Sequence, residues 1–301
     1  MNRMFLILLL IPTVLALAQQ PTKEDQEKEK KFREQAAKAA DTTKQYGWTP
    51  GAVAGINLTQ ASFKDWASGG ENSLAYNAWS ILQAVHLTER TEWANSLKLT
   101  FGQARLGDKE LRKTDDEIYF ESLLIYRLAV VVNPYAAVTL RTQFAPGYIY
   151  PDSTPRQQTS AFFDPAYLMQ SAGVAFAISP ILTTRLGVGV KEVVTSKFSA
   201  PYADDPSTSE IEKVKVQGGL ESVSELNYPF MQNMLFTSRL ELFAPFKTMD
   251  QIFVRWDNLL TAKVNKLIDV NFNLQLVQDV TVTPRTQVKE MLSIGVNYTL
   301  L

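Results

Sequence analysis

Residues 268–278 read IDVNFNLQLVQ, a run in which apolar and polar side chains alternate. Because successive side chains of a β-strand point to opposite faces, this pattern predicts a strand with one apolar and one polar face. Strands of water-soluble proteins usually have about five or six residues, whereas a tilted strand that crosses a bilayer needs about ten. The length and the alternation together therefore predict a membrane-crossing strand.

The same alternation recurs from residue 48 to the end of the chain. It is clear in 93–101, 136–144 and 292–300. It is weaker in eight further stretches, near 52–60, 74–87, 118–132, 167–178, 182–196, 212–226, 233–243 and 252–264. These stretches make about twelve strands, an even number that is typical of up-and-down barrels in outer membranes. The sequence predicts an all-β fold, a transmembrane β-barrel of about 12 antiparallel strands that covers residues 48–301.

The predicted connections alternate between long and short. The short ones centre on Thr88–Arg90, Asn133-Pro134, Ser179-Pro180, Tyr228-Pro229 and Asn265-Lys266. The long or moderate ones cover about 61–73, 103–117, 145–166, 197–211, 244–251 and 279–287. Outer-membrane barrels have short periplasmic turns and longer extracellular loops. This rhythm therefore predicts that both termini lie in the periplasm.

Charged side chains occupy the polar face of several predicted strands, which indicates a water-filled lumen. The residues expected to face it are Arg127, Arg141, Gln143, Arg185, Lys191, Arg239, Glu241, Arg255 and Asp257. Cations outnumber acids on the predicted inner face, so any conduction is expected to favour anions. Aromatic residues near predicted strand ends, among them Trp93, Tyr119 and Tyr135, indicate interfacial girdles. A water-soluble β protein is the alternative, because alternation alone occurs there too.

The amino terminus predicts export. Arg3 precedes the apolar run Met4–Leu17, and Ala16-Leu17-Ala18 supplies the small-x-small cleavage pattern. The run is shorter than the roughly 20 residues that a spanning helix needs, so we interpret 1–18 as a signal peptide. Residues 19–47 are highly charged and predict a disordered or helical periplasmic tail. The predicted location is the outer membrane of a Gram-negative bacterium, with membrane lipid as the first partner.

The composition argues against several functions. The 301 residues carry a formal net charge of −1, so a basic footprint for nucleic acid is missing. There is no cysteine and only one histidine, His86. No G-x-S-x-G motif is present, and Ser80, on the same predicted strand face, lies six residues from His86, so a hydrolytic triad is not expected. Without cysteine and with a single histidine, a thiolate or histidine-based metal site is not expected either. We expect no catalytic residue, no metal and no cofactor.

A glycine-rich segment and an acidic segment stand out in the predicted loops. Adjacent glycines allow a tight turn or an amide nest, and loop carboxylates can hold calcium, although turn formation is the simpler interpretation of both. The loop candidates for a binding role are Trp66, Gly69, Gly70, Asn72, Lys113, Asp115 and Asp116.

These segments also carry a family resemblance. Together with Trp93-x-Asn95, Thr142-Gln143-Phe144 and Gly147-Tyr148, they resemble an uncharacterised family of Bacteroidota outer-membrane barrels, domain of unknown function 3078. The resemblance implies the fold and the location but no activity. The final residue, Leu301, departs from the aromatic residue that usually ends such barrels.

Three functions remain open at this point. The first is a narrow pore or a passive, structural barrel, since twelve strands enclose less space than a 16-stranded porin. The second is an accessory subunit of an envelope assembly or secretion machine, which would bind other envelope proteins through the periplasmic tail or the long loops. The third is an outer-membrane enzyme, which the absence of nucleophile motifs disfavours.

Overall fold

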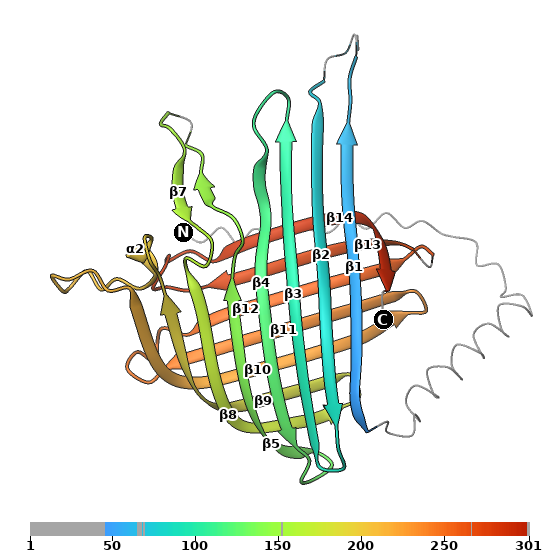
Figure 1. Ribbon diagram of the computed structural model, residues 1–301, viewed down its shortest axis with the longest axis vertical. Coiled ribbons are helices and arrows are strands. Elements are labelled where there is room, and N and C mark those ends of the chain that lie inside the picture. The colour runs from blue at the N-terminus through green and yellow to red at the C-terminus, as the bar shows by residue number, and fades with distance from the viewer. Residues whose placement is uncertain (1–45, 65–67, 69, 152, 266, 300–301) are drawn as a thin grey trace, which may run out of the picture. The chain divides into compact units, whose positions relative to one another are not determined.

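The computed structural model describes residues 46–64, 68, 70–151, 153–265 and 267–299. Twelve of their strands close into one antiparallel barrel, in the order β1-β14-β13-β12-β11-β10-β9-β8-β5-β4-β3-β2 (Figure 1). The predicted all-β barrel of about twelve strands is confirmed. The predicted signal peptide 1–18, and the predicted tail 19–47 up to Gln45, lie outside the described residues.

The barrel strands run from 11 to 18 residues in length. Their bounds are β1 Gly47–Ala61, β2 Ser73–Leu87, β3 Thr91–Leu106, β4 Arg112–Tyr126, β5 Val132–Thr142, β8 Ala166–Ser179, β9 Leu182–Val194, β10 Val214–Met231, β11 Met234–Pro245, β12 Phe253–Lys263, β13 Ile268–Gln278 and β14 Gln287–Thr299. In Figure 1, β1–β4 run steeply on the near side, and β10–β14 cross behind them at a slant.

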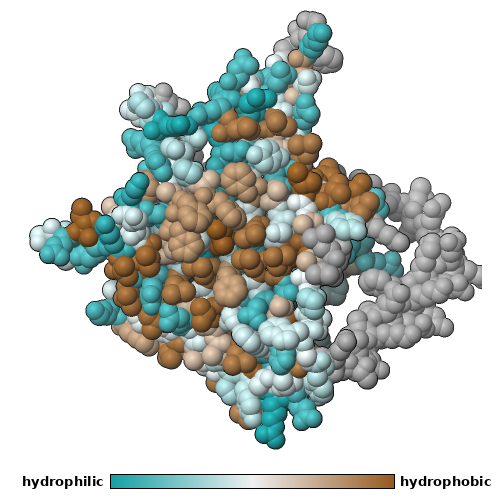
Figure 2. Space-filling model, viewed as in Figure 1, coloured by the Kyte–Doolittle hydropathy of each residue, from teal (hydrophilic) through white to brown (hydrophobic). Residues whose placement is uncertain are grey.

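The two faces of the sheet differ in polarity as the alternation predicts. On β13, Asn273 lines the cavity inside the barrel, whereas Phe272 is 36% exposed on the outside. The outward side chains of β14 are more open still, with Leu292 70% and Ile294 63% exposed. Figure 2 shows hydrophobic residues gathered across the middle of one outer face and hydrophilic residues toward its ends. An apolar exterior around a polar interior is the inverse of a water-soluble barrel.

Two of the predicted short turns are wrong. Asn133-Pro134 lies inside β5 and Tyr228-Pro229 lies inside β10. Each proline is paired on one side only, Pro134 with Val174 of β8 and Pro229 with Leu235 of β11. Since proline lacks only the donor, it fits a strand end where one neighbour has already stopped pairing. The actual turns are 127–131 and the two residues between β10 and β11.

The predicted long loop 103–117 is also wrong. β3 continues to Leu106 and β4 begins at Arg112, which leaves a tight connection that includes Gly107 at φ +59°. The charged residues 108–110 lie in this connection, whereas the charges from Lys113 to Glu117 belong to β4 and line the lumen cavity. Lys113, Asp115 and Asp116 therefore lie on β4 instead of in a loop.

The long connections that do exist gather beside one end of the barrel. The one after β5 contains a two-stranded hairpin, β6 Gly147–Ile149 with β7 Gln157–Ser160. The one after β9 contains the short helix α2, Ser199–Tyr202. Among the described residues, no helix has the length and apolarity that crossing a membrane requires.

The aromatic residues fall into two groups. Trp48, His86 and Trp93 form an exterior cluster at the short-turn end, with ring centroids 4.9 Å apart for Trp48 and His86 and 5.5 Å for Trp48 and Trp93. Tyr119 and Tyr135 instead point inward, where they contact Arg239 and Glu221. Their predicted place in an interfacial girdle is therefore wrong.

Candidate functional site in the barrel lumen

The barrel encloses a cavity of about 1500 Å³. Its lining includes Asp279 and Gln287 at the long-loop end of β13 and β14, and also Lys263 and Asn265 at the short-turn end. The cavity therefore extends along the whole length of β13, from one end of the barrel toward the other.

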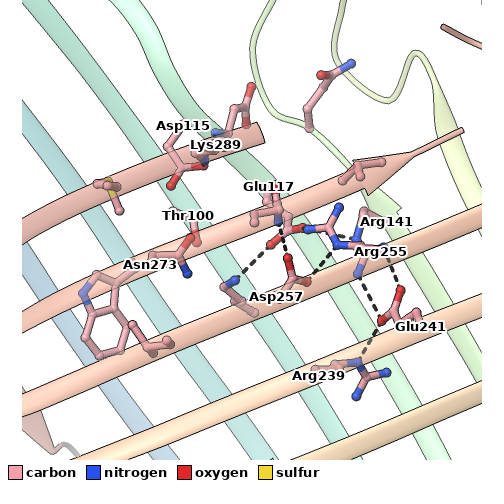
Figure 3. A pocket seen from close by; sticks show the side chains of 18 of the residues that line it. Thr100, Asp115, Glu117, Arg141, Arg239, Glu241, Arg255, Asp257, Asn273 and Lys289 are labelled. Carbon is pink, nitrogen blue, oxygen red and sulfur yellow. Dashed lines mark hydrogen bonds and ion pairs between the residues drawn. The ribbon is translucent and has the colours of Figure 1, made fainter. Parts of the chain in front are cut away.

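An ion-pair web crosses the lumen from β4 and β5 to β9, β11 and β12 (Figure 3). It consists of Glu117, Glu121, Arg141, Arg185, Arg239, Glu241 and Arg255. At one end of the web, Glu117 Oε1 lies 2.9 Å from Arg255 Nη2 and 3.2 Å from Arg141 Nε. The other Glu117 oxygen lies 3.1 Å from Lys98 Nζ. One carboxylate on β4 thus joins three strands: β3, β5 and β12.

Arg239 occupies the other end of the web. Its guanidinium donates to Glu241 on its own strand at 2.8 Å and to Glu121 across the lumen at 3.0 and 3.1 Å. It also donates to Tyr119 Oη at 2.9 Å and to Glu225. Such a planar fork of donors can bind several acceptors at fixed positions, which makes arginine the suitable residue for a network of this kind.

The web is buried although it lies in a lumen. Arg185 is 5% and Arg255 9% exposed. Charges removed from water are costly unless they are paired and hydrogen-bonded, and removing one partner leaves the other uncompensated. The web therefore fills this part of the lumen with a fixed, mutually neutralised layer rather than a layer of free charge.

The remaining lumen wall has a different chemistry. Along β1–β3, β13 and β14 the lining contains a set of neutral amides and hydroxyls, which we call the amide wall. Its members are Asn57, Asn77, Thr100, Asn271, Asn273, Gln275, Ser293 and Asn297. The charged Lys98, Asp269 and Lys289 and apolar residues such as Trp79 and Met291 lie among them. Gln275 Nε2 donates to Asp257 at 2.5 Å, which joins the amide wall to the web through the Asp257–Arg255 contact. Figure 3 shows Asn273 and Thr100 apart from the dashed contacts of the web.

The charges of the cavity lining are nearly balanced. The cavity is lined by nine cationic residues, Lys98, Lys113, Arg141, Arg185, Lys191, Arg239, Arg255, Lys263 and Lys289, and by eight acidic ones, Asp115, Asp116, Glu117, Glu221, Glu241, Asp257, Asp269 and Asp279. Within the described part of the chain, eight of the nine cations form ion pairs, and the ninth, Lys263, lies at the short-turn end. The basis for a strong anion preference is therefore weaker than the sequence indicates.

One ion pair lies at the long-loop mouth of the cavity. Lys191 Nζ is 3.5 Å from Asp279 Oδ2 and lies over the ring of Phe253, 4.0 Å from its centroid. Asp279 also accepts from the Thr281 hydroxyl at 2.6 Å. Burial raises the pKa of the Asp279 carboxyl, but Lys191 and the Thr281 donors lower it by more, so its pKa lies below the ordinary value.

The structure places the predicted lumen residues as follows. The cavity is lined by Arg141, Gln143, Arg185, Lys191, Arg239, Glu241, Arg255 and Asp257. Arg127 follows β4 at the short-turn end, where its guanidinium lies 2.5 Å from Glu92, and it is not part of this lining. Gln143 donates to the backbone oxygen of Asp164 at 2.8 Å and so holds the loop after β7.

The predicted loop candidates do not form one site. Trp66 and Gly69 lie outside the described residues. Asn72 accepts from the Phe63 amide at 2.7 Å and so closes the base of the β1–β2 loop, with Gly70 against the Phe63 ring. The β4 residues have structural partners: Asp116 accepts from Lys113 at 2.9 Å and from the amides of Phe144 and Ala145 at 2.8 Å each. Asp115 contacts Asn77 and Lys289.

Sequence reasoning missed the amide wall and the role of Glu117. Amides on the polar face resemble ordinary solvated side chains, so they gave no chemical signal. The predicted loop 103–117 includes Glu117, although this residue shares odd numbering with Tyr119 and Glu121. Extending that alternation back along 113–121 was the signal that could have found it.

Comparison with known proteins gives one family match and several structural matches. A family model described as "Protein of unknown function (DUF3078)" matches residues 58–148. The resemblance to an uncharacterised family is thus confirmed over that part, and the Bacteroidota origin stays a prediction. No curated protein matches the chain.

Solved structures with a similar fold include the translocator domain of the autotransporter NalP from Neisseria meningitidis. It has 11% identity and a TM-score of 0.40, over 91% of this chain and 95% of that one. The COG4313 outer membrane channel from Pseudomonas putida F1 has 15% identity and a TM-score of 0.39, over 85% and 95%. The Ralstonia pickettii toluene transporter TbuX has 9% identity and a TM-score of 0.28, over 85% and 89%. Similarity at this level supports no statement about the function of this chain.

Proposed function

We propose that this chain is an outer-membrane barrel that acts as a narrow pore for small polar solutes, with both termini on the periplasmic side. The exterior supports the membrane location. Side chains such as Leu292 and Val188 stand 70% and 56% exposed on the outside, and burying such surface in lipid instead of water is worth about 25 cal/mol per Å².

The observation that carries the pore is the polar cavity that follows β13 from end to end. The ion-pair web closes the part of the lumen between β4 and β11, so the open route is the part beside the amide wall. Amides and hydroxyls can replace the hydration of a small solute as donors and acceptors without holding it as an ion would be held. The route therefore suits small neutral solutes and hydrated ions of either sign.

Conductance of the purified full-length protein in planar bilayers tests this proposal. We expect small, uniform steps with weak ion selectivity, because the lining charges are paired. Liposome swelling should show entry of small sugars and exclusion of larger ones. Absence of conductance at every voltage and salt concentration would contradict the pore, and strong anion selectivity would contradict the neutralising role of the web.

We also infer that the barrel works without catalysis. The position of His86 supports this inference: its ring packs on Trp48 at the outer surface, and it is not among the residues that line the cavity. A phospholipid hydrolysis assay on reconstituted protein tests it. Activity that disappears in His86→Ala would overturn the inference.

A further inference from the structure

The barrel closes at an unusually short seam. Among the described residues, which end at Thr299, β1 and β14 pair over five positions, Val53–Asn57 with Gly295–Thr299. Every other neighbouring pair in the described barrel has at least eight paired positions, the number found for β4 with β5. Within the described residues, the seam is therefore the least extensively paired contact in the barrel wall.

Beyond Asn57 both strands stay extended but do not pair with each other. Leu58–Ala61 of β1 lies opposite Met291–Ile294 of β14 by continuation of the register, and these four positions carry no pairing between the two strands. At about 3.3 Å per residue the unpaired stretch is about 13 Å long. Over the same stretch β14 remains fully paired to β13 and β1 to β2, so the gap lies only between β1 and β14.

The outer face of this gap is apolar and its inner face is mixed. Leu58 and Leu292 point outward and are 61% and 70% exposed, whereas Met291 and Ser293 line the cavity. The amides Asn57 and Asn297 face inward in the paired part of the seam beside the gap. A gap with an apolar outer face, and with Ser293 and these amides on the cavity side, fits a molecule that is itself apolar at one end and polar at the other.

The packing within the seam leaves polar atoms without partners. Asn57 lies against Gly295 of the opposite strand, and Asn297 lies against Gly55 in the same way. Within the described residues, the side-chain oxygens Asn57 Oδ1 and Asn297 Oδ1 are buried and accept no hydrogen bond. An unmet buried acceptor costs about 1–3 kcal/mol, and unpaired strand edges in hydrocarbon are costly as well. Asn57 is the last paired residue of β1 before the gap, so its oxygen is the acceptor that a polar group entering at the gap would reach first.

We propose that the gap between β1 and β14 is a lateral opening through which the acyl chain of an amphiphile passes between the lipid and the cavity, its polar head group staying by the amide wall. The proposal rests on the proposed membrane location, because the gap faces lipid only if the apolar exterior does. It adds a second route to the end-to-end pore.

Site-specific quenching by membrane lipid tests the opening. The chain has no cysteine, so single-cysteine variants of the full-length protein can carry a bimane label in nanodiscs that contain doxyl-labelled phosphatidylcholine. The test variant is Met291→Cys, which faces the cavity at the gap. Ile294→Cys reports the lipid-facing surface, and Thr139→Cys reports the cavity lining on β5, away from the gap.

We expect strong quenching at Ile294→Cys, and quenching at Met291→Cys several-fold above that at Thr139→Cys. If Ile294→Cys is not quenched, the membrane location fails. If Ile294→Cys is quenched while Met291→Cys is quenched no more than Thr139→Cys, the lateral opening alone fails.

Disulfide formation gives a second, independent measurement. A disulfide needs Cα atoms about 4.4–6.8 Å apart, a condition that the paired positions Ala54 and Tyr298 meet in an antiparallel ladder. Ala54→Cys/Tyr298→Cys should therefore oxidise readily under mild conditions. Gln60→Cys/Leu292→Cys, at the gap, should remain reduced in protein that shows the same heat-modifiable migration as the parent. Equal oxidation of the two pairs would show a closed seam and overturn the proposal.

Discussion

The ion-pair web and the amide wall line the same lumen with opposite chemistry. In the web, each buried charge is held by partners from other strands, as Glu117 is by Arg141 and Arg255. In the amide wall, the inward groups are uncharged, and several make no contact across the lumen. The web side of the barrel cross-links its own strands, and the amide-wall side borders the space that the proposed pore would use.

Blocking the amide wall gives the largest expected effect. Asn273→Trp places a large ring on the cavity side of β13, so we expect loss of nearly all single-channel conductance. Thr139→Trp, on β5, should reduce conductance much less, because the proposed route follows β13. Planar-bilayer recording measures both. Equal loss in the two variants would show that the halves of the lumen conduct alike.

Breaking the web should affect stability more than breaking the amide wall. Arg239→Ala removes one of the two arginine partners of Glu121 and of Glu241, which keep Arg185 and Arg141, and we expect a loss of about 3 kcal/mol in the free energy of unfolding. Asn273→Ala removes a neutral side chain, with an expected change within about 1 kcal/mol. Urea unfolding followed by heat-modifiable gel migration checks the pair. The comparison breaks down if Asn273→Ala is as destabilising as Arg239→Ala.

The seam is the part of the amide wall that should tolerate least added volume. A Cβ at Gly55 would overlap Asn297 Oδ1 and lie 2.7 Å from the Trp79 ring. We expect Gly55→Ala to lower the free energy of unfolding by about 1–3 kcal/mol. Gly51→Ala on the same strand meets nothing nearer than Gln83 Cβ at 4.0 Å, so it should change stability by less than about 0.5 kcal/mol. A Gly55→Ala variant as stable as Gly51→Ala would mean that the seam can accommodate an added methyl group, which would contradict the tight packing around Gly55.

The mouth pair Lys191–Asp279 should give the smallest effect. Because the folded-state pKa of Asp279 is lowered, its stabilisation is present above the unfolded pKa of about 3.9 and is lost as the pH falls through the folded value. Both side chains are mostly buried, but the amide of Asp279→Asn can still accept from Thr281, so this variant should lower stability near about pH 7 by about 1–2 kcal/mol. The difference from the parent protein should shrink at lower pH. Urea midpoints across the pH range test this, and a difference that grows toward acid would contradict it.

Alternation within single strands predicted the fold well, because it is a local property. The run 268–278 alone assigns the inward and outward side chains of β13 correctly. Charge and proline predict strand ends less well. Lys113 and Pro229 favour a loop and a turn by residue type, yet both lie in strands.

The candidate site was harder to predict, for a different reason. Alternation shows that Glu121 and Arg185 both face inward, but not that they meet at 2.7 Å across 64 positions of chain. That contact depends on the height of each residue in the barrel, which the accumulated register of several strands determines. The short seam has the same origin, since it is set by the stagger between the first and last strands and not by any local motif.

The unequal strand lengths have a consequence for how molecules approach the barrel. β2 has 15 residues and β13 has 11, so at about 3.3 Å per residue the two differ by about 13 Å of chain. Because the bilayer has one thickness, the extra length of the longer strands must extend into water. Figure 1 shows β1–β4 rising beyond the other strands on one side. The rim of the barrel is therefore uneven. Molecules that approach from solution meet a raised wall on the side of β1–β4 and a lower rim on the opposite side.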